Sequence, residues 1–212
     1  MRSALLSLVA FAAAPAFAGN NELSIGNTNR SLRTASANAV TDENLGGMHL
    51  GAARQLHLDL VPNLQIWAAL GFSNTGAEGE LFGMPTEIDM LEFTGGGVAR
   101  YVLHRNFAVL ARVDIGPSRS SLAIEGNGHR VTDSSWGLTG TGALGVDLFL
   151  VAHRRFSLGA RFEMGYVTHS AATLAPREEA GEDMLVLDEF QASIGHLDLG
   201  GRYFAFSLLS QF

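Results

Sequence analysis

Apolar and polar side chains alternate with a period of two along most of this chain. In the stretch 156–166, one parity is apolar and reads Phe156, Leu158, Ala160, Phe162, Met164 and Tyr166. The other parity is small or charged and reads Ser157, Gly159, Arg161, Glu163 and Gly165. Similar alternation occupies 64–72, 91–101, 107–115, 136–150 and 203–212. Successive side chains of a β-strand point to opposite faces, so this pattern predicts an all-β protein whose strands each have one apolar face.

These segments are longer than strands of soluble proteins, which commonly have about 5–6 residues. A tilted strand needs about 9–11 residues to cross a bilayer. Two similar short turns, Val102–Phe107 and Val151–Phe156, connect pairs of segments, and a third lies between His57 and Asn63. Longer polar loops are expected around 35–44, 75–87, 117–134 and 171–192. Short turns on one side and long loops on the other predict an eight-stranded antiparallel up-and-down transmembrane β-barrel.

The N-terminus has the three parts of an export signal. Arg2 supplies positive charge, Ala4–Ala14 is an apolar run, and Ala16-Phe17-Ala18 is a small-residue cleavage site. We therefore predict a cleaved signal peptide at 1–18 and a barrel domain at 19–212. No later apolar run reaches the about 18 residues that a membrane-spanning helix needs.

Composition excludes further classes. The chain has no cysteine, so disulfides cannot stabilise it. Its net charge is −7 and all 14 basic residues are arginine. An acidic chain has no electrostatic reason to bind nucleic acid, so no nucleic-acid partner is expected.

The chain ends inside an alternating segment. Phe204, Phe206, Leu208 and Phe212 share one parity. Inside lipid every backbone N–H and C=O needs a partner, so a sheet must close on itself and its last strand must pair with its first, here placed at Glu22–Arg30. Closure turns the first three of these side chains toward hydrocarbon and leaves Phe212 at the inner interface.

This ending resembles the C-terminal signal of bacterial outer-membrane β-barrel proteins, a terminal Phe preceded by alternating apolar or aromatic residues. It departs from that pattern at Ser210, where the family often has an aromatic residue. The layout of the mature chain resembles the small eight-stranded group that includes the OmpA transmembrane domain, OmpX and OmpW.

The resemblance implies a protein of the outer membrane that contacts its lipid and lipopolysaccharide. It also implies that the barrel-assembly machinery recognises the C-terminal residues Phe204, Phe206, Leu208 and Phe212. The expected role is structural, contact at the cell surface, or passage of small apolar compounds. We expect a monomer that is not an enzyme, with no cofactor, no metal and no catalytic residues.

Charged residues fall on the parity that would face the barrel interior. They are Arg30, Glu92, Arg100, Arg112, Asp114, Asp147, Arg161 and Glu163. An eight-stranded barrel is just wide enough for side chains to fill, and buried charge is tolerated when it is paired. Four positive and four negative charges predict a closed, charge-balanced polar lumen, and a narrow water or proton path through the same residues is the alternative.

Two other functions stay open. His169 and Ser170 lie near the outer end of a strand, and some eight-stranded outer-membrane enzymes that modify lipid A use a lipid-facing His and Ser. Adjacent strand residues point to opposite faces, so this pair cannot act together directly, and a polar rim is the favoured interpretation. A soluble lipocalin-like barrel is the third hypothesis, but it would leave a large apolar surface in water.

Overall fold

The structure is a computed structural model that describes residues 20–32, 37, 40–41, 43–58, 61–126, 129–153, 156–174 and 195–212. The predicted signal peptide at 1–18 lies outside these residues, as does most of the loop expected at 171–192. In the described part of the chain, no helix is long and apolar enough to cross a membrane.

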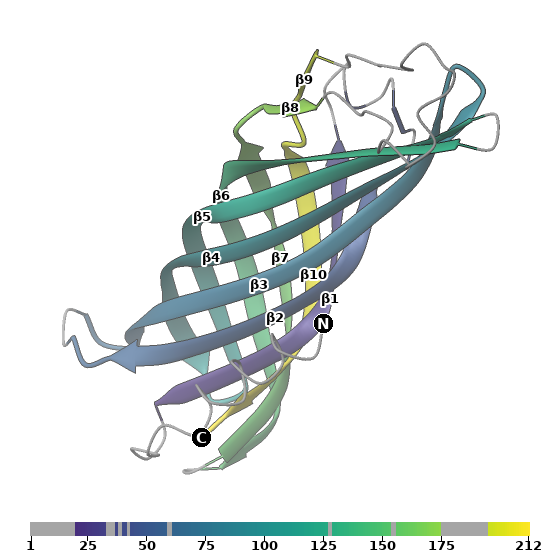
Figure 1. Ribbon diagram of the computed structural model, residues 1–212. Helices are drawn as coiled ribbons and strands as arrows, with labels where there is room; N and C mark the ends of the chain where they lie inside the picture. Colours follow the sequence, from purple (N-terminus) through teal and green to yellow (C-terminus); the bar gives the residue numbers. More distant parts are fainter. Residues whose placement is uncertain are drawn as a thin grey trace.

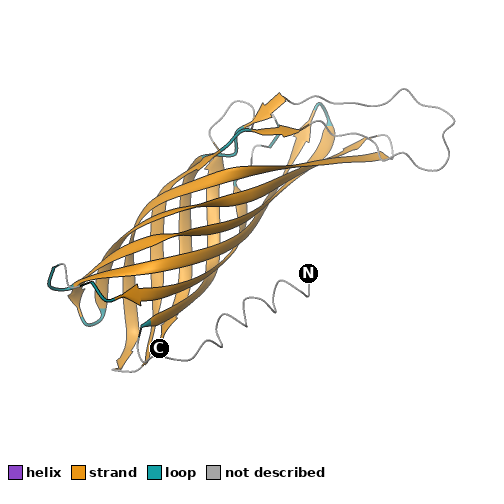
Figure 2. Cartoon of the chain, turned by 60° about the vertical axis from the view of Figure 1, so that its left-hand side comes forward, coloured by secondary structure: helices purple, strands orange, loops and turns teal. Residues whose placement is uncertain are grey.

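Eight antiparallel strands close into a barrel (Figures 1 and 2), as the sequence predicted. The barrel strands are β1 (Asn21–Leu32), β2 (Leu45–Leu56), β3 (Leu64–Leu81), β4 (Met84–His104), β5 (Phe107–Gly126), β6 (His129–His153), β7 (Phe156–His169) and β10 (Gly201–Gln211). A separate two-stranded sheet joins β8 (Ala172–Leu174) to β9 (Gly195–Leu197). Each barrel strand pairs with its neighbours in sequence order, except that β10 pairs with both β7 and β1.

The first and last strands form the seam that closes the ring. Their register brings Ile25 opposite Leu208 and Arg30 opposite Tyr203. At the end of the seam, the backbones of Asn21 and Phe212 exchange two hydrogen bonds of 3.0 Å. The chain end is therefore a paired strand, which explains why its last residues keep the alternating pattern.

Side chains alternate between the outer wall and the interior along each strand. In β10, Phe204 and Leu208 are 55 % and 56 % exposed, whereas Leu209 is 2 % exposed. Phe206 also lies on the outer wall, where its ring packs against Phe162 with centroids 4.9 Å apart. Such alternation gives most of the barrel strands an apolar outward face.

Two segments predicted to be loops, 75–87 and 117–134, are mostly strand where the structure describes them, and a two-residue turn at 82–83 separates β3 from β4. The β3–β4 pairing continues to Leu81 opposite Met84, and the β5–β6 pairing continues to Gly126 opposite His129. The outer neighbours of these hairpins stop earlier. The pairing of β2 with β3 ends at Gly76, and the pairing of β7 with β6 ends at Thr139. The described residues beyond, 77–90, 119–126 and 129–138, form a four-stranded extension of β3 to β6 that we call the projection (Figure 1).

The projection persists because its inner face packs on an apolar core. Ile88 and Met90 of β4 and Leu122 and Ile124 of β5 are fully or almost fully buried. They belong to a cluster that includes residues from the first long connection and from the small sheet, among them Leu32, Val40, Leu45, Leu174, Leu197 and Leu199. We call this cluster the apolar cap, since it fills the barrel at the end where the long hairpins lie.

Candidate functional site

The barrel interior is crossed by ion pairs, and several of them join strands that are not neighbours in the sheet. Arg161 of β7 donates hydrogen bonds of 2.7 and 2.9 Å to the two carboxylate oxygens of Asp147 on β6. Its Nη2 also lies 2.8 Å from Glu22 Oε1 on β1. Arg100 of β4 contacts the same two carboxylates, with Nε 2.7 Å from Asp147 Oδ2. These four residues link β1, β4, β6 and β7 across the lumen, and we call them the ion-pair belt.

The ion-pair belt is completed by groups that hold its members in place. Gln211 Nε2 donates a 2.9 Å hydrogen bond to Glu22 Oε2. The Arg100 guanidinium lies 4.6 Å from the centre of the Trp67 ring, within the range of a cation–π contact. Trp67 itself is buried with Ala69, Val98 and Leu110 in a small apolar cluster. Both charged and apolar contacts therefore fill this part of the lumen.

A second ionic group lies beside the ion-pair belt. Arg112 of β5 contacts Asp114 two residues along the same strand face. Its Nη1 is 3.7 Å from Glu163 Oε2 on β7 and 3.5 Å from His49 Nε2 on β2. All of these charged side chains are at most 7 % exposed, so they act in a low-dielectric interior.

A third ionic group lies under the apolar cap. Arg30 Nη2 of β1 is 2.7 Å from Glu92 Oε2 of β4, and Ser73 Oγ donates a 2.8 Å hydrogen bond to the same oxygen. Arg30 also donates to the backbone carbonyl of Leu199 and to the sulfur of Met90, both of which belong to the apolar cap. This arrangement ties the charged interior to the apolar cap above it.

All eight charged residues named from the sequence are buried in the lumen, and the structure distributes them over these three groups. Sequence reasoning missed Glu22, which is 3 % exposed. The described interior therefore holds four arginines and five carboxylates. The prediction of equal numbers of positive and negative charges missed one carboxylate. Glu22 shares the parity of Arg30 in β1, and extending the alternation back along that strand would have found it.

His169 lies in the interior rather than at a polar rim. Its Nε2 is 2.8 Å from Ser118 Oγ and 3.4 Å from Ser120 Oγ, and both serines are fully buried. Ser170 takes no part in this contact, because its Oγ accepts a 2.8 Å hydrogen bond from the backbone N–H of Leu138. The sequence placed Ser118 and Ser120 in an expected loop, so their contact with His169 was not predicted.

No group of three or more metal-ligating His, Asp or Glu side chains is present among the described residues. His104 lies in the turn between β4 and β5, and its Nδ1 accepts a 3.3 Å hydrogen bond from the backbone N–H of Asn106. This side chain stabilises its own turn.

No protein-family model matches the chain, and no curated protein matches it. Similar solved structures are barrels with little sequence identity. The outer-membrane protease OmpT of Escherichia coli aligns with a TM-score of 0.50 and 10 % identity, covering 92 % of this chain and 97 % of OmpT. Ail, the attachment invasion locus protein of Yersinia pestis, aligns with a TM-score of 0.45 and 12 % identity over 92 % of this chain and 98 % of Ail.

Neisserial surface protein A aligns with a TM-score of 0.41 and 9 % identity, covering 91 % of this chain and 95 % of that protein. At these identities the comparison concerns the fold and not the activity. The closed ring of eight antiparallel strands and the apolar outer wall agree with this likeness in fold. The chain has the fold of the small outer-membrane β-barrels.

Proposed function

We propose that this protein is an integral, non-enzymatic protein of the outer membrane, with a closed interior and a role in contacts at the cell surface. The outer wall supports the membrane assignment. Large apolar side chains project from it, including Val113, Ile115, Leu138, Leu144 and Met164, all at least 59 % exposed. In water this surface would be a strong aggregation liability, which argues against a soluble lipocalin-like barrel.

The observation that carries the proposed role is that the lumen is filled. The ion-pair belt joins Glu22, Arg100, Asp147 and Arg161 across the barrel, and all four are at most 4 % exposed on their side chains. Paired and hydrogen-bonded charge of this kind is costly to separate. A passage for small apolar compounds would have to cross these ion pairs and the apolar cap, so we favour a surface role over transport.

The orientation follows from the lengths of the connections. In outer-membrane barrels short turns face the periplasm and long segments face outward. We therefore place the turn at His104–Phe107 in the periplasm and the projection outside the cell. The projection is then the part of the molecule most available for contact with other molecules.

Two partners belong to the same proposal. Lipid and lipopolysaccharide would surround the apolar outer wall. The barrel-assembly machinery would recognise the C-terminal strand, whose outward residues are Phe204, Phe206 and Leu208, with Phe212 at its end. We propose a monomer, because closure satisfies the edges of the barrel without a second chain.

Conductance in planar lipid bilayers tests the closed interior. We expect the purified full-length protein to give no large, stable channel openings, since charged and apolar side chains fill the lumen. A porin inserted in the same bilayers serves as the control for the recording. Regular openings of large, reproducible size from this protein would overturn the proposal.

A lipid A-modifying enzyme is the competing function, and the contact between His169 and Ser118 is the observation that favours it. Both side chains of this pair are buried in the barrel, however, and do not face lipid. We expect expression of the protein to leave the mass of lipid A unchanged. A mass change that is lost with His169→Ala would establish an enzyme instead.

A further inference from the structure

The tip of the β3–β4 hairpin presents an aromatic ring in an unusual position. Leu81 pairs with Met84, and the two residues between them form the turn. Phe82 has φ 53° and Gly83 has φ 81°, so both have the positive φ that a type I′ turn requires. Asn-Gly is the favoured sequence there, and a bulky residue with positive φ is rare. This hairpin instead has Phe82, which is 93 % exposed.

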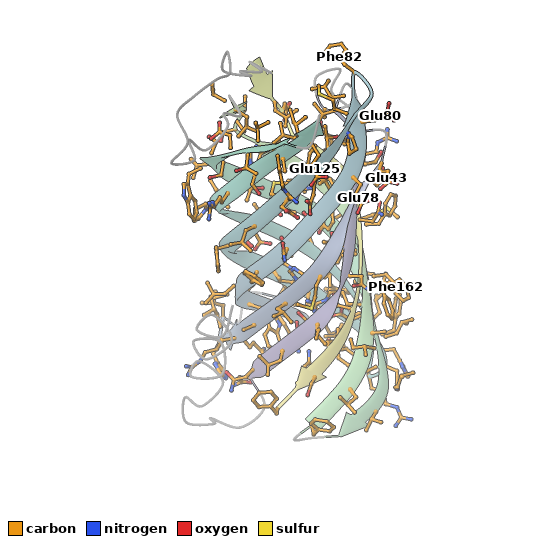
Figure 3. All side chains as sticks on the ribbon, turned by 45° about the vertical axis from the view of Figure 1, so that its right-hand side comes forward. Glu43, Glu78, Glu80, Phe82, Glu125 and Phe162 are labelled. Carbon is orange, nitrogen blue, oxygen red and sulfur yellow. The ribbon has the colours of Figure 1, made fainter. Side chains whose placement is uncertain are left out.

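Carboxylates occupy the outward face of the projection behind that tip. Glu78 of β3 lies directly opposite Glu87 of β4, an arrangement of like charges that destabilises a strand pair. Glu80 and Glu125 are exposed on the same side, and Figure 3 shows both below Phe82. Among the described residues paired with this set, Arg130 is the basic one, at 2.7 Å from Glu87 and 3.0 Å from Glu125. We call these four glutamates the acidic face.

A recess of about 280 Å³ opens within the acidic face. Three carboxylate side chains line it, those of Glu78, Glu87 and Glu125, together with the apolar side chains of Pro85 and Ala123. Lysine and arginine side chains combine a long apolar stem with a charged end. Such a side chain fits this recess, with its stem on the apolar lining and its charge beside the carboxylates.

We propose that Phe82 and the adjacent recess form a docking surface for a partner protein with two matching features. The partner offers an apolar pocket that accepts the Phe82 ring, and beside that pocket it carries an arginine or lysine that enters the recess. Aromatic residues are enriched at protein interfaces, where residues that fill a pocket of the partner supply much of the binding energy. This inference rests on the proposed surface role and specifies its partner by chemistry.

Charge decides among other occupants of this surface. Lipopolysaccharide and other polyanions would be repelled by the acidic face. A second copy of the chain would bring one acidic face against another. A basic partner gains attraction in both the encounter and the bound state.

A small host molecule with an apolar cavity and a cationic rim tests the proposal without knowledge of the partner. The probe is β-cyclodextrin with amino groups at its seven narrow-rim positions, whose cavity accepts one phenyl ring. Neutral β-cyclodextrin and sulfated β-cyclodextrin are the comparison probes. Binding to the full-length barrel in phosphatidylcholine nanodiscs is followed by NMR of labelled phenylalanine rings and by titration calorimetry.

We expect the aminated probe to shift the Phe82 ring signals and to bind at least about tenfold more tightly than the neutral probe. Phe82→Asn should abolish this binding although Asn-Gly suits the turn better, so misfolding cannot explain the loss. Glu78→Gln combined with Glu87→Gln should reduce affinity for the aminated probe toward that of the neutral one. Phe156→Ala removes a half-exposed ring at the opposite end of the barrel and should leave binding unchanged.

Several results would overturn the docking proposal. They are equal binding to wild type and Phe82→Asn, equal binding of the aminated and neutral probes, and preference for the sulfated probe. Self-association that depends on Phe82 would assign the surface to a second copy of the chain. Flotation of the nanodisc-embedded protein with anionic vesicles, if it depends on Phe82, would assign the surface to a membrane. A barrel that remains closed to ions in bilayers while failing these tests would refute the docking surface and leave the proposed function standing.

Discussion

Arg161 shows how single residues hold the interior together. It reaches Asp147 through two hydrogen bonds and Glu22 through an ion pair, and it is almost fully buried. A planar guanidinium suits this two-sided contact because its donors lie in a fixed fork. Without Arg161, the buried carboxylates of Glu22 and Asp147 would share one remaining arginine partner, Arg100.

Replacement of this side chain gives a direct stability prediction. Arg161→Met should lower the free energy of unfolding by about 3–5 kcal/mol, because breaking a buried ion pair leaves uncompensated charge. Urea unfolding in phospholipid vesicles measures the change. Arg54→Met, at an exposed position of β2, is the matched control and should change the free energy of unfolding by no more than about 0.5 kcal/mol. Equal small effects of both substitutions would show that the ion-pair belt does not stabilise the barrel.

Asp89, on the exposed outer face of the projection, gives a prediction about charge. Its pKa is raised above the ordinary value, chiefly by partial burial and further by the Glu87 carboxylate, while Arg130 lowers it. We expect Glu87→Gln to lower the pKa of Asp89 and Arg130→Gln to raise it, both measured by NMR titration of the labelled carboxyl carbon. Unchanged titration in Glu87→Gln would contradict the assigned cause.

The sign of the accompanying stability change follows from linkage. A carboxyl group with a raised folded pKa holds its proton more tightly in the folded protein than in the unfolded chain. Its contribution is therefore greatest below the ordinary aspartate pKa and is lost as pH rises from that value through the raised folded pKa. Asp89→Asn should remove the part of the pH dependence of the unfolding free energy that comes from this carboxyl group.

At the scale of elements, the projection marks the limit of the sequence prediction. The membrane-crossing parts of the strands were predictable because lipid on one side and a packed interior on the other enforce strict alternation. Beyond the bilayer, Glu87 and Asp89 made the segment 75–87 and its continuation resemble a polar loop. Ile88 and Met90 nevertheless alternate with them and pack on the apolar cap, so the strand continues. Packing against residues distant in sequence was not visible in the local pattern.

The C-terminal strand gives a prediction that separates assembly from stability. Phe212→Ala should reduce the folded fraction in outer membranes several-fold, because we propose that this residue belongs to the signal for barrel assembly. Gel mobility of unheated and boiled membrane fractions measures that fraction. Unfolding of the same variant after refolding in detergent should change by no more than about 0.5 kcal/mol, since Phe212 is only partly buried. Normal assembly in cells would contradict the assigned role.

For the whole molecule, the sequence predicted closure and the burial of charge, whereas the partners of each charge required the structure. Alternation placed Arg100 and Arg161 inside, but which carboxylates they contact depends on the stagger of strands that are distant in sequence. Glu22 was missed because the first strand has little apolar alternation to fix its parity. His169 was assigned to the rim because it lies near the outer end of a strand. Its contacts, Ser118 and Ser120, lie in a segment that was expected to be a loop, so its burial was not predicted.

The central claim is that successive side chains along a strand face lipid and the closed interior alternately. Leu208 and Leu209 provide a matched pair within one strand, since they are 56 % and 2 % exposed. The most direct measurement is the nuclear Overhauser effect between lipid acyl chains and assigned methyl groups of the full-length protein in nanodiscs. We predict strong transfer to the methyl groups of Leu208, Val113 and Ile115, and none from lipid or bulk water to those of Leu209 and Leu110. Transfer from lipid to Leu209, or from water to Leu208, would contradict the structure described above.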